Sequence, residues 1–470
     1  MEGYTGDRLQ EKCGVSAVFT NNETAARLVY FSLSALQHRG QEAAGIVSSN
    51  SDEFFAHGAG GLVSQVFSEA HLSRLNGHMA IGHNRYATSG SKQDGHIQPV
   101  LRGDDLIALA HNGNLPSTTK LMKFLKLKKI YKRGSNDSEM MADAIRYYMY
   151  HGSSAATAIK KAWPLFTGAF SCVLMDHDGI YAFRDSRGIR PLSVGRLGSG
   201  YAIASETCAF DLIGAEFMRD VLPGELVKIT GRGLTSYQIE KPDPKLEVFE
   251  FIYFARPDSR LLGQTVNEVR RRLGEKLAEE SPAKADVVVP VPDSAVPAGL
   301  GFARASGIDF DHGLIKNRYV HRTFIHPTQE LREQAVRMKV NPLRSTLEGK
   351  DVVLVDDSIV RGTTLRQLIG MLRSCNVGKI HVRISCPPII YPDFYGIDTP
   401  DQSKLISSHK TPAEIAQLVG ADSLSFLSYE GMIDAIGVSE DMLCTACFSG
   451  KYPIDIMERT AEIKSISVMA

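Results

Sequence analysis

The chain has 470 residues, which is too long for one ordinary hydrophobic core, so we expect two domains. Hydrophobic residues make up 43% of it and charged residues 23%, proportions that exclude a disordered or collagen-like protein. Lysine and arginine number 53, as do aspartate and glutamate, so the formal net charge is zero. Such a balance does not indicate the basic surface of a nucleic-acid-binding protein, and we expect no nucleic-acid partner.

The chain carries seven cysteines at scattered positions, an odd number that argues against a disulfide framework and favours a reducing compartment. Residues 1–12 mix both charge signs and contain no apolar run, unlike a signal peptide. The longest apolar stretches, such as 168–175, are too short to span a bilayer. We therefore expect a cytoplasmic protein with no membrane partner.

The first half of the chain alternates short apolar stretches with turns. Strands are predicted at 14–19, 79–82, 106–110, 169–175 and 201–205, and helices at 25–36 and 138–150. Because these strands lack a regular strand–helix–strand alternation, they predict antiparallel sheets with helices packed on their faces. Glycines and prolines without apolar periodicity place the end of this domain within 231–246, and we set the boundary between residues 240 and 241.

The second half has a different spacing of apolar residues. Strands are predicted at 287–289, 351–357 and 379–386, separated by helices at 295–305 and 365–372. Strand, helix and strand at this spacing predict an α/β domain with a doubly wound parallel sheet over residues 241–470.

The strongest local signal is the segment VVLVDDSIVRGTT at 352–364. An apolar strand ends in Asp356 and Asp357, at the sheet edge where open α/β proteins bind ligands. Their carboxylates can accept hydrogen bonds from vicinal hydroxyls or hold Mg²⁺ beside a pyrophosphate. The residues that follow offer N–H groups and hydroxyls suited to a phosphate monoester: Ser358, Arg361, Gly362, Thr363 and Thr364. Helix capping alone would explain the threonines but not the two acids.

This segment resembles the motif with which type I phosphoribosyltransferases bind phosphoribosyl pyrophosphate (PRPP). The resemblance implies that the acids contact the ribose hydroxyls and that the Gly-Thr loop holds the 5′-phosphate. It also implies that the loop VPVPDSA at 289–295 binds pyrophosphate, with Ser294 joining Asp356 and Asp357 around Mg²⁺. The basic segment 316–339, including Arg322 and Lys339, would then close over PRPP; the alternative is a solvated surface loop.

Several fragments of the first half resemble the class II glutamine amidotransferases. They are CGVSAVF at 13–19, QHRGQE at 37–42, GHNRYAT at 82–88, HNG at 111–113 and SNDSE at 135–139. The resemblance implies an α+β domain of the N-terminal nucleophile type, with four αββα layers, over residues 13–240. Cys13 would be the nucleophile after a propeptide, residues 1–12, is removed. The freed α-amino group, whose ordinary pKa is near ~8, would serve as the base.

The same resemblance assigns roles to residues distant from Cys13. Asn112 and Gly113 would stabilise the oxyanion. Four residues would bind glutamine: Arg39, Gly40, Arg85 and Asp137. For Arg39 or Asp137 taken alone, a surface ion pair is the alternative.

The two halves in this order resemble the amidophosphoribosyltransferases, from Cys13 to about Pro453. The resemblance implies that ammonia from glutamine displaces pyrophosphate from C1 of PRPP, giving 5-phosphoribosylamine, the first step of purine nucleotide synthesis. It also implies inhibition by purine nucleotides and a homotetramer. One alternative is another glutamine-dependent ammonia transferase, but a Ser-Gly-Gly ATP loop is missing. The other is a non-catalytic PRPP-binding regulator, which would not need Cys13.

The chain differs from many members of this family at the position of a [4Fe–4S] cluster that four cysteines hold. Cys444 and Cys447 are present, whereas Glu247 and Asp393 stand where two further thiolates would be needed. Because cysteine thiolates are the main ligands of such clusters, we expect no cluster here. A zinc site of two cysteines and two carboxylates is the alternative to a metal-free contact, which we favour.

Overall fold

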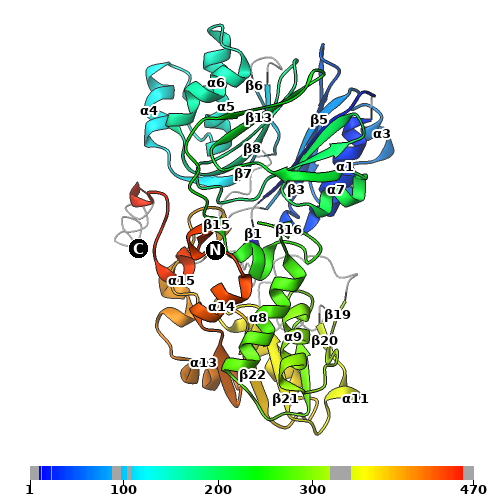
Figure 1. Ribbon diagram of the computed structural model, residues 1–470, viewed down its shortest axis with the longest axis vertical. Helices are drawn as coiled ribbons and strands as arrows, with labels where there is room; N and C mark the ends of the chain where they lie inside the picture. Colours follow the sequence, from blue (N-terminus) through cyan, green and yellow to red (C-terminus); the bar gives the residue numbers. More distant parts are fainter. Residues whose placement is uncertain are drawn as a thin grey trace.

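Figure 1 shows the chain in a computed structural model, which describes residues 10–11, 13–22, 24–86, 97–102, 107–317, 340–399 and 401–458. Two bodies lie one above the other along the long axis (Figure 1). The first half of the sequence forms the upper body and the second half forms the lower one. Within the described residues, no helix combines the length and the apolar character that crossing a membrane requires.

The upper body contains a seven-stranded antiparallel sheet with β2 at its centre. Its strands are, in spatial order, β12 (Glu216–Asp220), β10 (Ser193–Leu197), β11 (Gly200–Ala204), β2 (Cys13–Phe19), β5 (Met79–Arg85), β3 (Ala43–Ser49) and β4 (Phe54–Gly60). Successive side chains of β2 point to opposite faces: Val15 and Ala17 join a core shared with a second sheet, whereas Val18 packs under helices.

A six-stranded antiparallel sheet faces the first. Its strands are, in spatial order, β14 (Gly233–Gln238), β13 (Glu225–Thr230), β9 (Ile180–Arg184), β8 (Thr167–Met175), β7 (Ile107–Ser117) and β6 (Val100–Arg102). One apolar cluster contains residues of both sheets, such as Val15 of β2 and Val173 of β8, so the sheets pack face to face.

Helices cover the outer faces of both sheets. Those packed on the seven-stranded sheet are α1 (Ala25–Ala35), α2 (Val63–Val66), α3 (Glu69–Leu72) and α7 (Cys208–Ile213). Those packed on the six-stranded sheet are α4 (Thr119–Leu127), α5 (Asp137–Tyr150) and α6 (Ala155–Ala162). The predicted four-layer αββα domain is therefore confirmed.

The lower body is built on a parallel sheet. Its strands are, in order, β18 (Val287–Pro290), β21 (Val352–Asp356), β22 (Ile380–Ile384) and β24 (Ser423–Phe426). Phe310 makes a further parallel bridge to Val288 of β18. Phe310 and β21 thus lie on opposite sides of β18, so the direction in which the chain crosses the sheet reverses at β18. This reversal is the predicted doubly wound connection. Ligands bind such sheets where the order reverses, at the carboxyl ends of β18 and β21.

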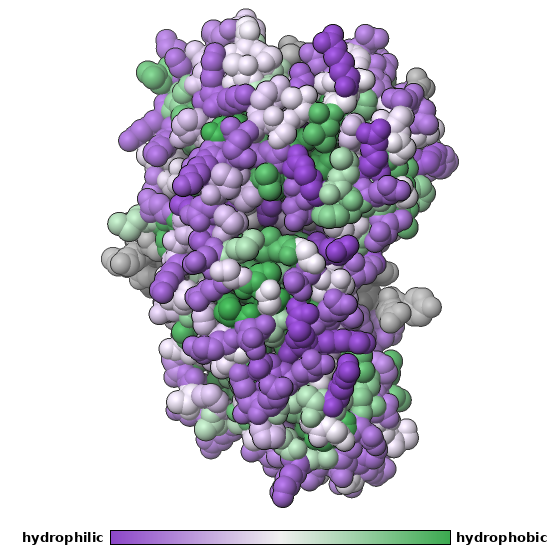
Figure 2. Space-filling view, in the orientation of Figure 1, coloured by the Kyte–Doolittle hydropathy of each residue, from purple (hydrophilic) through white to green (hydrophobic). Residues whose placement is uncertain are grey.

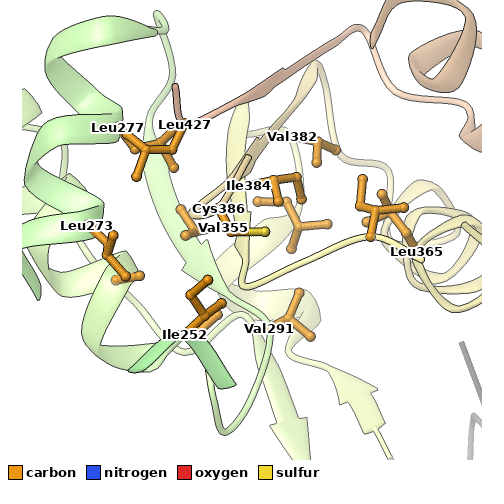
Figure 3. Packing of buried hydrophobic residues seen from close by; sticks show 14 of the residues in the cluster. Ile252, Leu273, Leu277, Val291, Val355, Leu365, Val382, Ile384, Cys386 and Leu427 are labelled. Atoms are coloured by element: carbon orange, nitrogen blue, oxygen red, sulfur yellow. The ribbon is translucent and has the colours of Figure 1, made fainter. Parts of the chain in front are cut away.

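Five helices pack with this sheet in one apolar cluster. They are α8 (Val266–Glu280), α9 (Val296–Ser306), α12 (Thr363–Arg373), α13 (Pro412–Val419) and α14 (Tyr429–Ile436). Figure 3 shows Val355 and Ile384 of the sheet lying between Leu273 of α8 and Leu365 of α12. Because helices cover both faces, β21 is a continuous apolar run rather than an alternating one.

Short elements join the two bodies at the waist of the molecule (Figure 1). β15 (Leu246–Glu247) pairs in parallel with β25 (Leu443–Cys444), and a π-helix at Glu250–Phe254 follows β15. β1 (Gln10–Glu11) pairs with β23 (Ile397–Asp398), so the backbone just before Cys13 lies against the second half. Figure 2 shows a mainly hydrophilic face on which apolar residues gather at mid-height.

Further short strands and helices lie in the second half of the chain. They are the hairpin of β16 (Arg260–Leu261) and β17 (Gln264–Thr265), the hairpin of β19 (Leu314–Lys316) and β20 (Val340–Pro342), and helices α11 (Arg344–Leu347) and α15 (Ala446–Ser449).

Candidate active sites

Cys13 is the first residue of β2 and is 8% exposed. It is paired with Arg85, the last residue of β5, which is also paired with Ala43 of β3. Opposite residues in antiparallel strands have Cα atoms about 4.5–5.5 Å apart. The thiol and the guanidinium predicted to bind the α-carboxylate of glutamine therefore start from neighbouring positions at one end of the sheet.

The turn after α1 brings Arg39 and Gly40 to the same end of the sheet. A Cβ on Gly40 would lie 2.6 Å from the carbonyl carbon of Asn84 and 2.7 Å from backbone atoms of Arg85, so this approach requires glycine. The side chain of Arg39 is fully buried, and its guanidinium pairs with the carboxylates of Glu206 and Glu250. A contact of Arg39 with glutamine would therefore have to use its backbone.

Asn112 lies on β7, in the sheet that faces β2. Close to it, Nε2 of His83 lies 3.2 Å from the carbonyl oxygen of His111 and connects β5 to β7. Burial lowers the pKa of His83 to about 3, so its imidazole is neutral and donates to this carbonyl. The side-chain amide of Asn112 is buried and has no hydrogen-bond partner within the described residues. Such an amide is available to a substrate oxyanion.

Gly113 follows with a φ of +148°, in the region that favours glycine. A Cβ at this position would lie 2.1 Å from the carbonyl oxygen of Ala169 in the neighbouring strand. Any side chain here would push β7 away from β8. The glycine therefore allows the backbone that carries the predicted oxyanion donor.

Asp137 is positioned by the start of α5. The side chain of Asn136 accepts a hydrogen bond from the N–H of Glu139 at 2.8 Å, and the Glu139 carboxylate accepts one from the N–H of Asn136 at 3.0 Å. This capping box places Asp137 in the first turn, where its carboxylate accepts from the N–H of Leu115 at 3.2 Å. Asp137 also lies 3.8 Å from Nδ1 of His111, beside the strand that carries Asn112.

The second site lies where β18 and β21 end. Asp356 and Asp357 are 4% and 1% exposed. Ser294, in the loop after β18, donates from Oγ to Oδ2 of Asp357 at 2.5 Å, and Oγ of Ser358 donates to Oδ1 at 2.7 Å. The N–H of Asp357 donates to Oδ1 of Asp356 at 3.0 Å. The fold therefore brings together the three residues predicted to hold Mg²⁺.

These three residues suit Mg²⁺, which prefers oxygen ligands. In the part of the chain that the structure describes, no group of three or more His, Cys, Asp or Glu side chains is arranged to hold a metal. Ser294, Asp356 and Asp357 supply fewer oxygens than the six that octahedral Mg²⁺ binds, so oxygens of the pyrophosphate would have to complete such a site. Binding through one or two carboxylates and substrate phosphates is its usual mode in proteins.

The predicted phosphate loop forms the turn into α12. Gly362 has a φ of +79°, and α12 begins directly after it, at Thr363. A Cβ on Gly362 would lie 3.2 Å from Cδ1 of Ile406, so both conformation and space favour glycine. The N–H groups of the first turn, with Arg361 and Thr364, lie at the same sheet edge as Asp356. Such N–H groups are a common binding site for phosphate.

Arg322 and Lys339 lie outside the described residues, with the whole of 318–339. The residues on either side of this segment form the hairpin of β19 and β20. Nζ of Lys316 lies 2.7 Å from Oδ2 of Asp293 in the predicted pyrophosphate loop. A cavity of about 480 Å³ adjoins this ion pair. The base of the predicted lid is thus beside the second site.

Glu247, Asp393, Cys444 and Cys447 are buried at the waist. Glu247 pairs with Cys444 in the β15–β25 ladder, and its carboxylate oxygens have no hydrogen-bond partner within the described residues. Burial and the charge of Asp393 raise the pKa of Glu247 well above its usual range. Burial likewise raises the pKa of Cys444 and that of Cys447. Two cysteines and two carboxyls differ from the four thiolates that usually hold an iron–sulfur cluster.

Sequence reasoning missed a buried group of charges that joins the two bodies. Arg190, Glu206 and Glu250 belong to it, together with Arg39. No local pattern marks these residues, because arginine and glutamate are usually exposed and their burial depends on how the two bodies pack.

Comparison with known proteins covers both bodies. Residues 83–211 match the family described as glutamine amidotransferase domain, and residues 262–394 match the phosphoribosyl transferase domain. An amidophosphoribosyltransferase of Synechococcus elongatus is 48% identical over 470 residues, covering 98% of this chain and 95% of that protein. The amidophosphoribosyltransferase of Bacillus subtilis is 45% identical over 460 residues, covering 96% of each. The chain belongs to the amidophosphoribosyltransferase family.

Two solved structures share the fold over nearly the whole chain. The first, described as the allosteric regulatory enzyme of purine biosynthesis, has a TM-score of 0.89 and 45% identity and covers 94% of this chain and 97% of its own. The second, the glutamine PRPP amidotransferase of Bacillus subtilis complexed with ADP and GMP, has a TM-score of 0.88 and 44% identity and covers 94% and 98%. Family membership therefore applies to both halves together.

Proposed function

We infer that the chain is an enzyme that transfers ammonia from glutamine to C1 of PRPP, giving 5-phosphoribosylamine, glutamate and pyrophosphate, in purine nucleotide synthesis. One observation carries this inference. The likeness to the amidophosphoribosyltransferases extends over 98% of the chain and so includes both Cys13 and the pair Asp356 and Asp357.

In the first half-reaction, Sγ of Cys13 attacks the side-chain amide of glutamine. The base is the α-amino group of Cys13, freed when residues 1–12 are removed. The amide of Asn112 and the N–H of Gly113 hold the oxyanion, and losing one such donor costs about 10²–10³ in kcat. The protonated α-amino group then gives its proton to the leaving nitrogen, ammonia departs, and water hydrolyses the thioester to glutamate.

The α-carboxylate and the α-ammonium of glutamine are each bound by a charged side chain. Arg85 binds the α-carboxylate through its guanidinium fork, and Asp137 binds the α-ammonium. Gly40 and the backbone of Arg39 line the pocket between them. The close approach of Gly40 to Arg85 supports this assignment.

In the second half-reaction, ammonia attacks C1 of PRPP as pyrophosphate leaves. Asp356 and Asp357 accept hydrogen bonds from the ribose hydroxyls, and the turn containing Ser358, Arg361, Gly362, Thr363 and Thr364 holds the 5′-phosphate. Ser294 and the two aspartates would hold Mg²⁺, which would supply positive charge to the pyrophosphate. Arg322 and Lys339 close the lid over PRPP.

Ammonia must pass from one site to the other without meeting water, because free ammonia would be protonated and lost. We place the catalytic units at residues 13–240 and 241–470. The short elements at the waist, from β15 to Phe254, then lie between the two sites.

The function is tested with purified protein, glutamine and PRPP. We expect glutamate and pyrophosphate in equal amounts, and a mature chain whose first residue is Cys13 on N-terminal sequencing. A chain that still begins at Met1 and forms neither product would disprove the proposed reaction. Exogenous ammonia in place of glutamine reports separately on the second half-reaction.

We propose that the position occupied by iron–sulfur clusters in related enzymes holds no metal here. Glu247 and Asp393 are buried and take the place of two of the four thiolates that usually hold such a cluster. Iron, zinc and acid-labile sulfide measured on anaerobically purified protein should all be far below one per chain. Stoichiometric iron with sulfide, or stoichiometric zinc, would contradict this.

We further propose purine nucleotides as inhibitors, a homotetramer, and a cytoplasmic location. The description of one structural relative as an allosteric enzyme and the ADP and GMP in another support the first of these. Light scattering tests the tetramer directly.

A further inference from the structure

Four charged side chains lie fully buried where the two bodies meet; we call them the interdomain ion cluster. They are Arg39, Arg190 and Glu206 of the first half and Glu250 of the second. Nη2 of Arg39 lies 2.6 Å from Oε2 of Glu250, and Nη2 of Arg190 lies 3.0 Å from its Oε1. Nε of Arg39 also contacts Oε1 of Glu206. One carboxylate of the second half is thus held between two arginines of the first.

The second carboxylate of the cluster also reaches across the boundary. Oε2 of Glu206 accepts hydrogen bonds from Oγ of Ser259 at 2.6 Å and from the N–H of Arg256 at 2.9 Å. Although burial raises it, the charge of Arg39 and a hydrogen bond from His38 hold the pKa of Glu206 below its ordinary value. Glu206 is therefore ionised, and the two arginines and two glutamates balance.

The need for stability does not explain this arrangement well. Removing four charges from water is unfavourable, and well-packed apolar residues often stabilise a protein equally. Buried ion pairs are better attested as devices that fix one relative position of two elements. In this cluster the two elements belong to different halves of the enzyme.

The cluster touches the backbone on which the glutaminase site is built. A Cβ on Gly14, the residue after Cys13, would lie 3.4 Å from Cβ and Cδ of Arg39. A Cβ on Gly396 would lie 3.7 Å from Cδ and Nε of Arg190 and 3.6 Å from Cα of Gly113. Arg39 thus packs beside the nucleophile strand, and Arg190 packs close to the oxyanion strand.

On its other side, the cluster holds the segment that leads to the second site. Glu250 is the first residue of the π-helix Glu250–Phe254, and the guanidinium of Arg190 lies 5.8 Å from the ring of Phe254. Arg270 of α8 donates to the carbonyl oxygens of Phe251 at 2.7 Å and Ala255 at 2.8 Å. The π-helix is therefore fixed to both bodies at once.

We propose that Arg39, Arg190 and Glu250 are positioning residues that fix the Glu250–Phe254 segment against the Cys13 and Gly113 strands, so that ammonia released at Cys13 reaches PRPP rather than water. This inference rests on the proposed function. It assigns to the cluster the coupling of the two half-reactions and not the chemistry of either.

The test is Glu250→Gln in the full chain, which removes the charge but nearly keeps the shape. Because Glu250 is not one of the residues proposed to bind PRPP, ammonia-dependent pyrophosphate release should stay within about twofold of the parent value. With glutamine, the ratio of glutamate to pyrophosphate should rise about two- to thirtyfold, the range expected for coupling through a packed network. A ratio that stays at equality would overturn the proposal.

A matched control is Glu225→Gln, which removes another buried carboxylate. Its oxygens lie 2.7 and 2.8 Å from the guanidinium of Arg219, and both residues belong to the first half. This variant should leave the ratio at equality; a rise as large as that of Glu250→Gln would mean that any buried charge loss uncouples the reactions, and would overturn the proposal.

A second variant keeps the test decisive if Glu250→Gln does not fold. The double variant with Arg190→Met as well removes one charge of each sign, so the remaining pair of Arg39 and Glu206 stays balanced. It should fold and still release excess glutamate, whereas equal products from it would contradict the proposal. If the parent protein releases no pyrophosphate with ammonia or glutamine, the proposed function itself fails. That result is distinct from equal products in either variant, which would contradict only the coupling role of the cluster.

Discussion

Replacement of Cys13 by alanine is expected to abolish glutamine-dependent synthesis while leaving synthesis from ammonia. In the proposed mechanism only the thiol forms a covalent bond with glutamine. Glutaminase activity should therefore fall by about 10⁴- to 10⁶-fold, as for other nucleophile deletions. The PRPP site shares no residue with it. Glutamate and pyrophosphate should be measured with glutamine and, separately, with a high concentration of an ammonium salt.

Cys172→Ala is the matched control for this variant. Cys172 is also buried in the same domain, but its side chain packs in the cluster under α4, α5 and α6. It should retain glutamine-dependent activity. Glutamine use that survives in Cys13→Ala would show that Cys13 is not the nucleophile, and loss of ammonia-dependent activity would show that the substitution has damaged more than the first site.

Replacement of both Asp356 and Asp357 by asparagine is expected to remove pyrophosphate release with either nitrogen source. Each carboxylate accepts hydrogen bonds from the ribose hydroxyls, and a hydrogen bond to a charged acceptor is worth about 1.5–3 kcal/mol. Each loss should therefore lower kcat/KM for PRPP about ten- to a hundredfold. The two losses act on the same substrate and need not add. The assay is ammonia-dependent pyrophosphate release over a range of PRPP and Mg²⁺ concentrations.

Asp351→Asn controls for a loss of strand stability. Asp351 directly precedes β21 at the end opposite Asp356, and its carboxylate accepts from the N–H of Lys379 at 2.6 Å. The variant should keep its KM for PRPP. If it loses activity as the double variant does, the effect lies in the strand and not in the ligand site, and the assignment of Asp356 and Asp357 would be wrong.

The second site could be predicted in detail because its parts are close together in the sequence. An apolar strand, two acids and a turn into a helix occupy 352–364, and the structure keeps them in that order at one sheet edge. α12 begins at Thr363, directly after Gly362, whose left-handed backbone ends the turn.

The glutaminase site was predicted only through resemblance, since its residues are scattered over 125 positions from Cys13 to Asp137. The structure explains how they meet: Cys13 and Arg85 are opposite in one sheet, Asn112 lies in the sheet that faces it, and a capping box presents Asp137. Strand pairing of this kind depends on long-range contacts that no local pattern contains.

By itself, the sequence predicted antiparallel sheets in the first half, a parallel sheet in the second, and the order of strand, acids and turn in 352–364. Apolar periodicity and turn residues encode such features within a few consecutive positions. Only the tertiary structure decided that the guanidinium of Arg39 faces Glu206 and Glu250 rather than a substrate. The physical reason is that a charge is buried only where a distant partner compensates it, and the packing of the two bodies alone brings Glu250 to Arg39.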